Sequence, residues 1–178
     1  MDQAVVDIPK IIESYPWTAG KLLSREEAPL VAEKARSEGK KIISVNGSFD
    51  LLHPGHLIVL TEAKKQGGIL FVGLNLDESV KRYKGKDRPI MPEGERIAML
   101  AALTCVDYIV PIIEPEAGKA ILLTVHPDVH VNGSEYGEPE TWYEWPTIKE
   151  LGCKTYSVSR RPDLATTNII KKIKELSV

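Results

Sequence analysis

Two of the chain's four histidines, His53 and His56, lie within four residues of each other and flank Pro54 and Gly55. Proline suits the first position of a helix, since it lacks the N–H group that would have no partner there, and it fixes the turn between the two imidazoles. Gly55 has no side chain, so a ligand could lie against the backbone between the rings. A single histidine would more simply cap the helix or pack locally. The pair instead favours two ring N–H donors that face one phosphoryl group.

The histidine pair follows a strand-like segment and opens a helix-like one. Residues 41–45 form an apolar run rich in Ile and Val, Asn46-Gly47 predicts a turn, and apolar residues repeat at helical spacing from residue 54 onward. The first turn of such a helix has N–H groups without partners, and the helix dipole attracts an anion there. The sequence therefore predicts a phosphate site at this strand-to-helix junction.

Apolar runs and helical patterns alternate along the rest of the chain. Strands are expected at about residues 41–45, 69–74, 108–113, 129–131 and 154–159. A continuous run such as 69–74 is typical of a parallel strand covered on both faces. This rhythm predicts an α/β fold, a Rossmann-like, doubly wound and mainly parallel five-stranded sheet with helices on both faces. Its ligand cleft should lie at the carboxyl ends of the strands.

The composition restricts the class of protein. The 178 residues are 43% apolar and 27% charged, which is ordinary for one soluble domain with a sizeable core. The net charge of −2 gives no general attraction to nucleic acid or to an anionic membrane, so a phosphate site must be local. We expect neither of those partners. No membrane-length apolar run and no signal-peptide pattern occur, which predicts a cytoplasmic protein.

The two cysteines show no spacing typical of a metal site. Cys105 and Cys153 form no C-x-x-C pair, and both lie in apolar settings near expected strands. We interpret them as small core residues rather than as nucleophiles or a disulfide.

A cluster of basic residues lies between residues 79 and 91, around Gly85. Its members are Lys81, Arg82, Lys84, Lys86 and Arg88. A solvated surface loop is the simpler interpretation of such a cluster. The segment nevertheless follows a strand at the expected ligand edge, where a flexible cationic loop could close over a polyphosphate.

The segment G-S-F-D-L-L-H-P-G-H at residues 47–56 resembles the H-x-G-H motif of the nucleotidylyltransferase superfamily. Further segments resemble, in the same order, the adenylyltransferase domain of the bifunctional heptose-phosphate kinase and heptose-1-phosphate adenylyltransferase. These segments are L-S-R-E-E at 23–27, V-G-L-N-L-D-E-S-V-K-R-Y-K-G at 72–85, R-P-I at 88–90 and C-V-D-Y-I-V at 105–110. The resemblance implies that residues 1–23 are an N-terminal extension and that residues 24–178 are the nucleotidylyltransferase domain.

The resemblance also implies a set of site residues. Catalytic roles fall on His53, His56 and Lys84. Nucleotide contacts fall on Gly47, Ser48, Phe49, Asp50, Gly55, Arg88, Asn132, Gly133, Thr166 and Thr167. Thr166 and Thr167 match the family's S-T-T element, whose hydroxyls contact the outer phosphates, although they could also simply cap a helix.

Two positions depart from the family pattern. Asn132 stands where a lysine is common, which removes a positive charge from the expected site. Ala165 stands where the family has a serine, which removes one hydroxyl donor. Both departures bear on substrate identity and on triphosphate affinity.

Two other features have competing interpretations. Glu95-Arg96 resembles a family pair but could equally be an ion pair on a helix surface. Trp142 and Trp145 could stack on a nucleobase or sugar, although such aromatic residues more often fill the core or a subunit contact.

The activity that the resemblance implies is transfer of AMP from ATP to a sugar 1-phosphate, with release of pyrophosphate. The expected acceptor is D-glycero-D-manno-heptose 1-phosphate, giving ADP-heptose for lipopolysaccharide biosynthesis. Magnesium should arrive with the triphosphate and need no dedicated protein metal site. The resemblance also implies a homodimer.

Three alternatives remain open from the sequence. A cytidylyltransferase would use CTP with glycerol phosphate or another alcohol phosphate. A nucleotide-binding module that has lost catalysis would explain the departures at Asn132 and Ala165. A dinucleotide-dependent oxidoreductase fits poorly, because no G-x-G-x-x-G follows the first strand.

Overall fold

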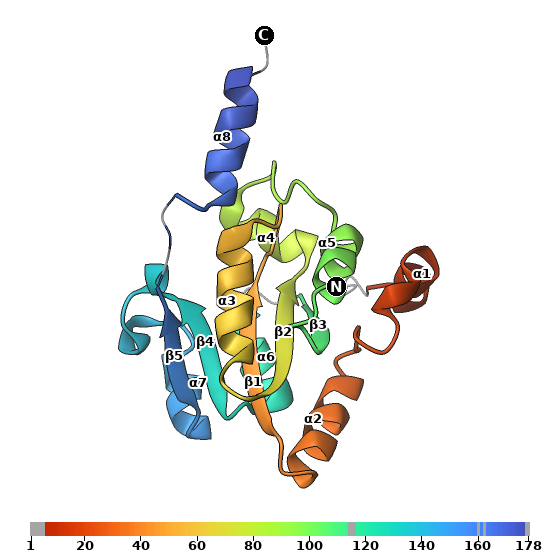
Figure 1. Ribbon diagram of the computed structural model, residues 1–178, viewed down its shortest axis with the longest axis vertical. Coiled ribbons are helices and arrows are strands. Elements are labelled where there is room, and N and C mark those ends of the chain that lie inside the picture. The colour runs from red at the N-terminus through yellow and green to blue at the C-terminus, as the bar shows by residue number, and fades with distance from the viewer. Residues whose placement is uncertain (1–5, 114–116, 160, 162, 177–178) are drawn as a thin grey trace.

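The computed structural model describes residues 6–113, 117–159, 161 and 163–176 (Figure 1). Five strands form one parallel sheet: β1 (Lys41–Gly47), β2 (Gly68–Asn75), β3 (Tyr108–Ile112), β4 (Val129–Gly133) and β5 (Lys154–Val158). Their order is β3-β2-β1-β4-β5. The α/β fold that the sequence predicted is confirmed, and every strand pair in the sheet is parallel.

The strand order reverses direction between β1 and β4. From β1 the chain moves outward through β2 and β3, and then crosses back to β4 and β5 on the other side. Val45 pairs with Val72 of β2 and with Val131 of β4. The carboxyl ends of β1 and β4 therefore lie side by side, and such a switch point is where open α/β sheets bind their ligands.

Eight α-helices accompany the sheet in the described part of the chain. They are α1 (Ile8–Ser14), α2 (Glu27–Ser37), α3 (Pro54–Lys64), α4 (Asp77–Lys84), α5 (Glu93–Ala101), α6 (Ala117–Val125), α7 (Trp145–Leu151) and α8 (Thr166–Leu176). Short 3₁₀ turns occur at Pro16–Thr18, Ser134–Tyr136 and Pro139–Thr141. None of the described helices is long and apolar enough to cross a bilayer.

Alternate residues of the central strands fill two cores, one on each face of the sheet. Ile43 and Leu70 belong to the cluster that includes residues of α3 and α5, while their neighbours Ile42 and Phe71 belong to the cluster of α2 and α6. All four side chains are 0% exposed. The period of two in a strand explains the division, because successive side chains point to opposite faces.

The helix starts follow the local sequence signals. Before α2, Ser24 and Glu27 form a capping box, in which the Ser24 N–H donates to Glu27 Oε2 at 2.8 Å and the Glu27 N–H donates to Ser24 Oγ at 3.2 Å. α3 begins at Pro54, as predicted, with His53 as its N-cap. These two starts place α2 and α3 on opposite faces of β1.

The prediction that residues 79–91 form a flexible loop is wrong for its first part, which belongs to α4. Asp77 and Glu78 lie in the first turn of α4, and Lys81, Arg82 and Lys84 lie in the last. This charge order complements the helix dipole, and an ion pair joins Glu78 to Arg82 one turn later. The basic residues thus stabilise a helix end instead of keeping the segment open.

The N-terminal extension packs on the β3 side of the sheet. Trp17 Nε1 donates to the Ala98 carbonyl of α5 at 2.9 Å, and Leu22 forms a parallel bridge with Ile109 of β3. Leu22 is 4% exposed, and the half-buried Ile8 and Ile11 pack against the same core. The described part of the extension, from residue 6 onward, therefore packs on its own domain.

Candidate functional site

A pocket of about 440 Å³ opens at the switch point, between the ends of β1 and β4, the start of α3 and the start of α8. It brings together site residues predicted from distant parts of the sequence. Those that line it are Gly47, Ser48, Phe49, His53, Gly55, His56, Lys84, Arg88, Asn132, Gly133, Thr166 and Thr167. Asp50 is the predicted site residue that does not line the pocket. It is 1% exposed and lies behind the wall.

The two imidazoles stack at the start of α3. Their ring centroids are 3.9 Å apart, with an interplanar angle of 25°. His53 Nδ1 accepts the Gly55 N–H at 3.1 Å, which places the proton of a neutral His53 ring on Nε2. A Cβ on Gly55 would come within 2.8 Å of His53 Cε1 and 2.9 Å of the Leu164 carbonyl. Glycine is therefore required between the histidines.

His56 is held in its neutral form. Burial, together with the charges of His53 and Lys84, lowers the pKa of His56 from 6.5 to about 3. Its buried Nδ1 has no hydrogen-bond partner in the described part of the chain. A neutral ring keeps one N–H donor, and placing an anion beside it requires no proton uptake.

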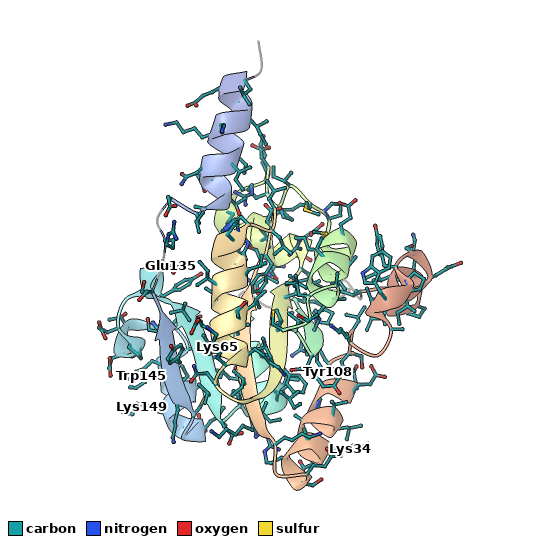
Figure 2. The ribbon with its side chains drawn as sticks, viewed as in Figure 1. Lys34, Lys65, Tyr108, Glu135, Trp145 and Lys149 are labelled. Atoms are coloured by element: carbon teal, nitrogen blue, oxygen red, sulfur yellow. The ribbon has the colours of Figure 1, made fainter. Side chains whose placement is uncertain are left out.

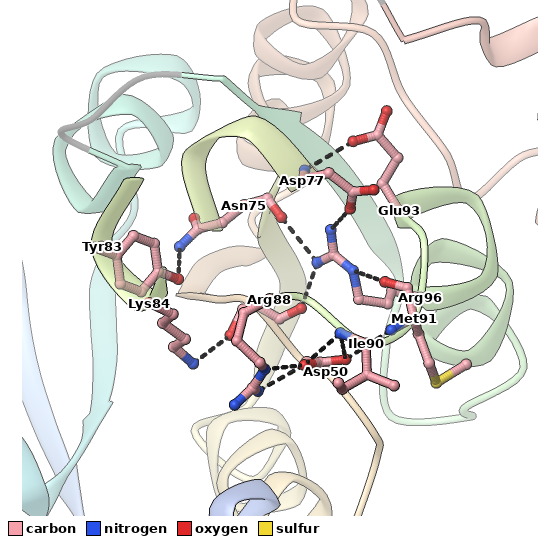
Figure 3. A network of polar contacts seen from close by, with 11 residues as sticks. Asp50, Asn75, Asp77, Tyr83, Lys84, Arg88, Ile90, Met91, Glu93 and Arg96 are labelled. Atoms are coloured by element: carbon pink, nitrogen blue, oxygen red, sulfur yellow. Dashed lines mark hydrogen bonds and ion pairs between the residues drawn. The ribbon is translucent and has the colours of Figure 1, made fainter. Parts of the chain in front are cut away.

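Lys84 and Arg88 supply positive charge on the α4 side of the pocket (Figure 3). Much of the Lys84 side chain is exposed, but its ammonium group donates to Ser48 Oγ at 2.8 Å. Partial burial of that group, with the neighbouring Arg88 charge, lowers the pKa of Lys84. A phosphate would relieve both effects, so this lysine is suited to bind an anion.

Asp50 fixes the position of Arg88 from behind the pocket wall. Arg88 Nε and Nη2 lie 2.8 and 2.6 Å from Asp50 Oδ2. Burial opposes ionisation of Asp50, but the N–H groups of Met91 and Ile90 and the Arg88 side chain outweigh it and lower the Asp50 pKa. Asp50 is therefore ionised and holds Arg88 in place, but it does not itself line the pocket.

Arg96 connects three segments around the pocket, as Figure 3 shows. The interpretation of Glu95-Arg96 as a surface ion pair is wrong, because the Arg96 side chain is 0% exposed. It donates to the carbonyls of Ser48, Asn75 and Met91 and to Asp77 Oδ1 at 2.7 Å. The carboxyl ends of β1 and β2 and the segment before α5 are thus held by one guanidinium group.

The start of α8 reaches the pocket from the far end of the chain. Thr166 Oγ1 donates to the Asp50 carbonyl at 2.7 Å, so this hydroxyl ties α8 to the histidine segment. Thr167 and Ala165 line the pocket beside it. Otherwise α8 extends away from the sheet and contributes no buried residue (Figure 1).

Several pocket residues were missed at the sequence level. They are Asn46, Glu135, Ser159, Arg161 and Leu164. Asn46 and Ser159 could have been found, because each lies at or just beyond the carboxyl end of an expected strand. Glu135 offers no such signal. Its position beyond β4, visible in Figure 2, depends on the 3₁₀ turn Ser134–Tyr136.

The remaining aromatic and sulfur residues have structural positions. Trp142 is 4% exposed, packs with Leu122 and Ile148, and donates from Nε1 to the Gly137 carbonyl at 3.0 Å. Trp145 packs against the same cluster, which supports the core interpretation of both residues. Cys105 and Cys153 are free thiols, and burial raises the pKa of Cys153 to about 11. Cys153 is consequently a poor nucleophile.

Comparison with known proteins identifies related sequences and folds. The profile of the family described as cytidylyltransferase-like matches residues 44–174. The chain is 36% identical to the bifunctional protein HldE of Haemophilus influenzae over 97% of its length, and 36% identical to HldE of Geotalea uraniireducens over 96%. It spans 36% and 34% of those two proteins, about one third of their length.

Two solved structures resemble the chain. The lipopolysaccharide core biosynthesis protein of Thermoplasma volcanium has a TM-score of 0.56 at 30% identity, covering 69% of this chain and 98% of that protein. The pantoate-beta-alanine ligase of Francisella tularensis has a TM-score of 0.57 at 16% identity, covering 89% of this chain and 79% of that one. The second likeness concerns the fold alone.

Proposed function

The chain belongs to the cytidylyltransferase-like family, within the nucleotidylyltransferase superfamily, and from that membership we propose a reaction. In this reaction the protein transfers a nucleotidyl group from a nucleoside triphosphate to a small phosphorylated substrate and releases pyrophosphate. The observation that carries the proposal is the convergence of the stacked His53 and His56, Lys84 and the start of α8 on one pocket.

The mechanism follows from the charges of the groups present. The attacking oxygen belongs to a phosphate that is already largely ionised at neutral pH, so the reaction needs no general base. His53 and His56 donate from their ring N–H groups to the α-phosphoryl oxygens as negative charge develops on them. Lys84 and the N-terminus of α8 hold the departing pyrophosphate. Catalysis is thus positioning and electrostatic stabilisation.

We propose that Mg²⁺ enters with the triphosphate. Among the described residues, no three histidine, cysteine, aspartate or glutamate side chains lie close enough together to hold a metal ion. Mg²⁺ usually keeps several water ligands and is bound through substrate phosphates with few protein ligands. The ion supplies charge neutralisation on the phosphates, while the chain's own residues orient them.

Among the possible substrates, we favour ATP as donor and a sugar 1-phosphate, D-glycero-D-manno-heptose 1-phosphate, as acceptor. The support is the 36% identity to HldE and the sequence resemblance to heptose-1-phosphate adenylyltransferases. CTP with glycerol phosphate is the second candidate, favoured by the cytidylyltransferase-like profile. A module without catalysis is the third. Its support is limited to Asn132 and Ala165, since His53, His56 and Lys84 are all present.

One assay separates these candidates. ATP, CTP, GTP and UTP are each combined with heptose 1-phosphate, glucose 1-phosphate and glycerol 3-phosphate, and pyrophosphate release is measured with Mg²⁺. His56→Ala should lower the rate on the order of a hundredfold to a thousandfold, as the loss of a preorganised donor does. His126→Asn is the matched control, because His126 lies outside the pocket and Asn tolerates its φ of +46°. Retained turnover in His56→Ala would overturn the assigned role.

The homodimer implied by the resemblance stays a prediction. Light scattering of the purified chain measures it directly, and a monomeric mass at assay concentration would contradict it.

A further inference from the structure

A buried polar chain lies behind the β4 side of the pocket. Ser44, His130, Asn132 and Glu144 are between 0% and 7% exposed. Ser44 Oγ lies 2.7 Å from His130 Nδ1, and His130 Nε2 lies 3.2 Å from Glu144 Oε1. Asn132 Nδ2 donates to the same Glu144 oxygen at 2.7 Å. Of these four residues, only Asn132 lines the pocket.

Glu144 is ionised within this chain. Burial opposes its ionisation, but the hydrogen bond and electrostatic attraction of His130, followed by the hydrogen bond from Asn132, outweigh that effect and lower the Glu144 pKa. The carboxylate also lies against Gly118 in the first turn of α6, where a Cβ would come within 3.0 Å of Glu144 Oε2. The missing side chain of Gly118 leaves space for the Glu144 carboxylate. The positive end of the α6 dipole also favours its negative charge.

The charge on Glu144 determines how Asn132 is oriented. An ionised carboxylate has no proton to donate, so the Asn132 amide must turn its nitrogen toward Glu144. His130 is also satisfied, with Nε2–H donating to Glu144 and Nδ1 paired with Ser44 Oγ. The Asn132 Oδ1 is then directed away from Glu144, and no described residue donates a hydrogen bond to it.

A second acceptor lies beside Asn132. The Glu135 carboxylate covers Gly133 so closely that a Cβ there would come within 2.0 Å of Glu135 Oε2. Both residues line the pocket. The β4 side therefore presents acceptor oxygens, whereas the opposite side presents the imidazoles, Lys84 and Arg88.

The acceptor oxygens on the β4 side distinguish the phosphate groups of a substrate from its hydroxyl and amino groups. An ionised phosphate offers only acceptor oxygens, and beside Asn132 Oδ1 and the Glu135 carboxylate it would meet repulsion. A hydroxyl or amino group offers the donor that these oxygens need. We propose that Glu144 is a positioning residue that fixes Asn132 as an acceptor, so that the β4 side of the pocket receives a neutral hydroxyl or amino donor of the substrate. This inference rests on the proposed function and specifies how a substrate is oriented within that site.

Binding measurements test the division of the pocket. The probes are inorganic pyrophosphate, which carries phosphates alone, and α,β-methylene-ATP, which adds ribose and base. They are titrated into the unmodified chain, Glu144→Gln and Asn132→Leu by calorimetry. The glutamine of Glu144→Gln can donate or accept a hydrogen bond, so the Asn132 amide is no longer held in one orientation. Asn132→Leu removes the acceptor oxygen altogether. Both variants should bind pyrophosphate within twofold of the unmodified chain.

Binding of α,β-methylene-ATP and steady-state kinetics together show whether the hydroxyl or amino donor belongs to the nucleoside or to the acceptor substrate. If the donor belongs to the nucleoside, α,β-methylene-ATP should bind about tenfold more weakly to both variants, as the loss of one hydrogen bond implies. If it belongs to the acceptor, nucleotide affinity should hold and KM for the sugar phosphate should rise about tenfold, with kcat little changed. Glu150→Gln, on the exposed face of α7, is the matched control and should change neither quantity.

Two results would overturn the inference. Pyrophosphate affinity that falls as much as the other constants would show that the β4 side binds phosphate. Unchanged constants for both the nucleotide and the acceptor, in variants with native circular dichroism, would show that Glu144 and Asn132 only support the fold. Failure of the unmodified chain to bind α,β-methylene-ATP would instead overturn the proposed function, and this inference with it.

Discussion

His56 shows how the pocket sets the chemistry of a single residue. Its ring lies between His53, Phe49 and the Lys84 charge, and the same desolvation that prevents its protonation leaves an N–H donor for an anion. A charged imidazolium would bind phosphate more strongly in the ground state. A neutral donor instead contributes most where negative charge increases during the reaction, which is the condition for lowering a barrier.

The lowered pKa of His56 predicts a pH-dependent stability. Below pH 6.5 the unfolded chain binds a proton at His56, whereas the folded chain does not until about pH 3. The free energy of unfolding should therefore fall as pH is lowered below 6.5, by about 1.4 kcal/mol per pH unit from this residue. Urea unfolding at pH 7.5 and 5.5 measures it. His56→Asn should lose less stability than the unmodified chain over this interval, and parallel losses would show that His56 titrates normally.

Some residues of the site could be predicted from the sequence, and others could not. His53, His56, Lys84 and Thr167 were predicted from a local motif or from the family resemblance, and all four line the pocket. The sequence left two interpretations of Arg96 open, because burial of a guanidinium depends on carbonyls contributed by β1, β2 and the segment before α5. A pattern within one helix contains no information on such partners. Glu135 was missed because its place at the pocket depends on the 3₁₀ turn Ser134–Tyr136, which has no clear sequence signal.

At the scale of elements, the pocket depends on how separate segments are joined. β1, β2 and α3 were predicted from apolar runs and a proline start, since parallel strands and helix caps have local signals. The helical state of residues 77–84 was not predicted, because a basic cluster around Gly85 is also typical of a solvated loop. The spacing of these basic residues after Asp77 and Glu78 was an equally valid helix signal.

Arg96 connects several elements, and among the residues that do so its loss should lower the free energy of unfolding most. Arg96→Met removes the donor from three buried or partly buried carbonyls and leaves Asp77 without its ion-pair partner. The free energy of unfolding should fall by about 3–5 kcal/mol, as when one member of a buried ion pair is removed. Urea unfolding measures the change. Arg82→Met, which breaks the exposed pair with Glu78, is the control and should cost less than about 1 kcal/mol. Equal losses in the two variants would contradict the role of Arg96.

At the scale of the molecule, the sheet places the pocket and the N-terminal extension apart. The pocket lies between β1 and β4, whereas the extension packs on β3 at one edge and on α5. The parallel class of the sheet was predictable from its rhythm of strands and helices. The location of the extension was not, because the half-buried Ile8 and Ile11 would fit any apolar surface.

This separation predicts different effects of truncation on stability and on chemistry. Deletion of residues 1–17 removes α1 and the Trp17 bond to Ala98, and should lower the free energy of unfolding by about 1–2 kcal/mol, because partial burial is offset by ordering entropy. Pyrophosphate release below the melting temperature should stay within twofold. Deletion of residues 1–22 also removes the fully buried Thr18 and the Leu22 bridge to Ile109, and should cost several-fold more stability. If the protein that lacks residues 1–17 is folded but has lost pyrophosphate release, the extension contributes to the reaction.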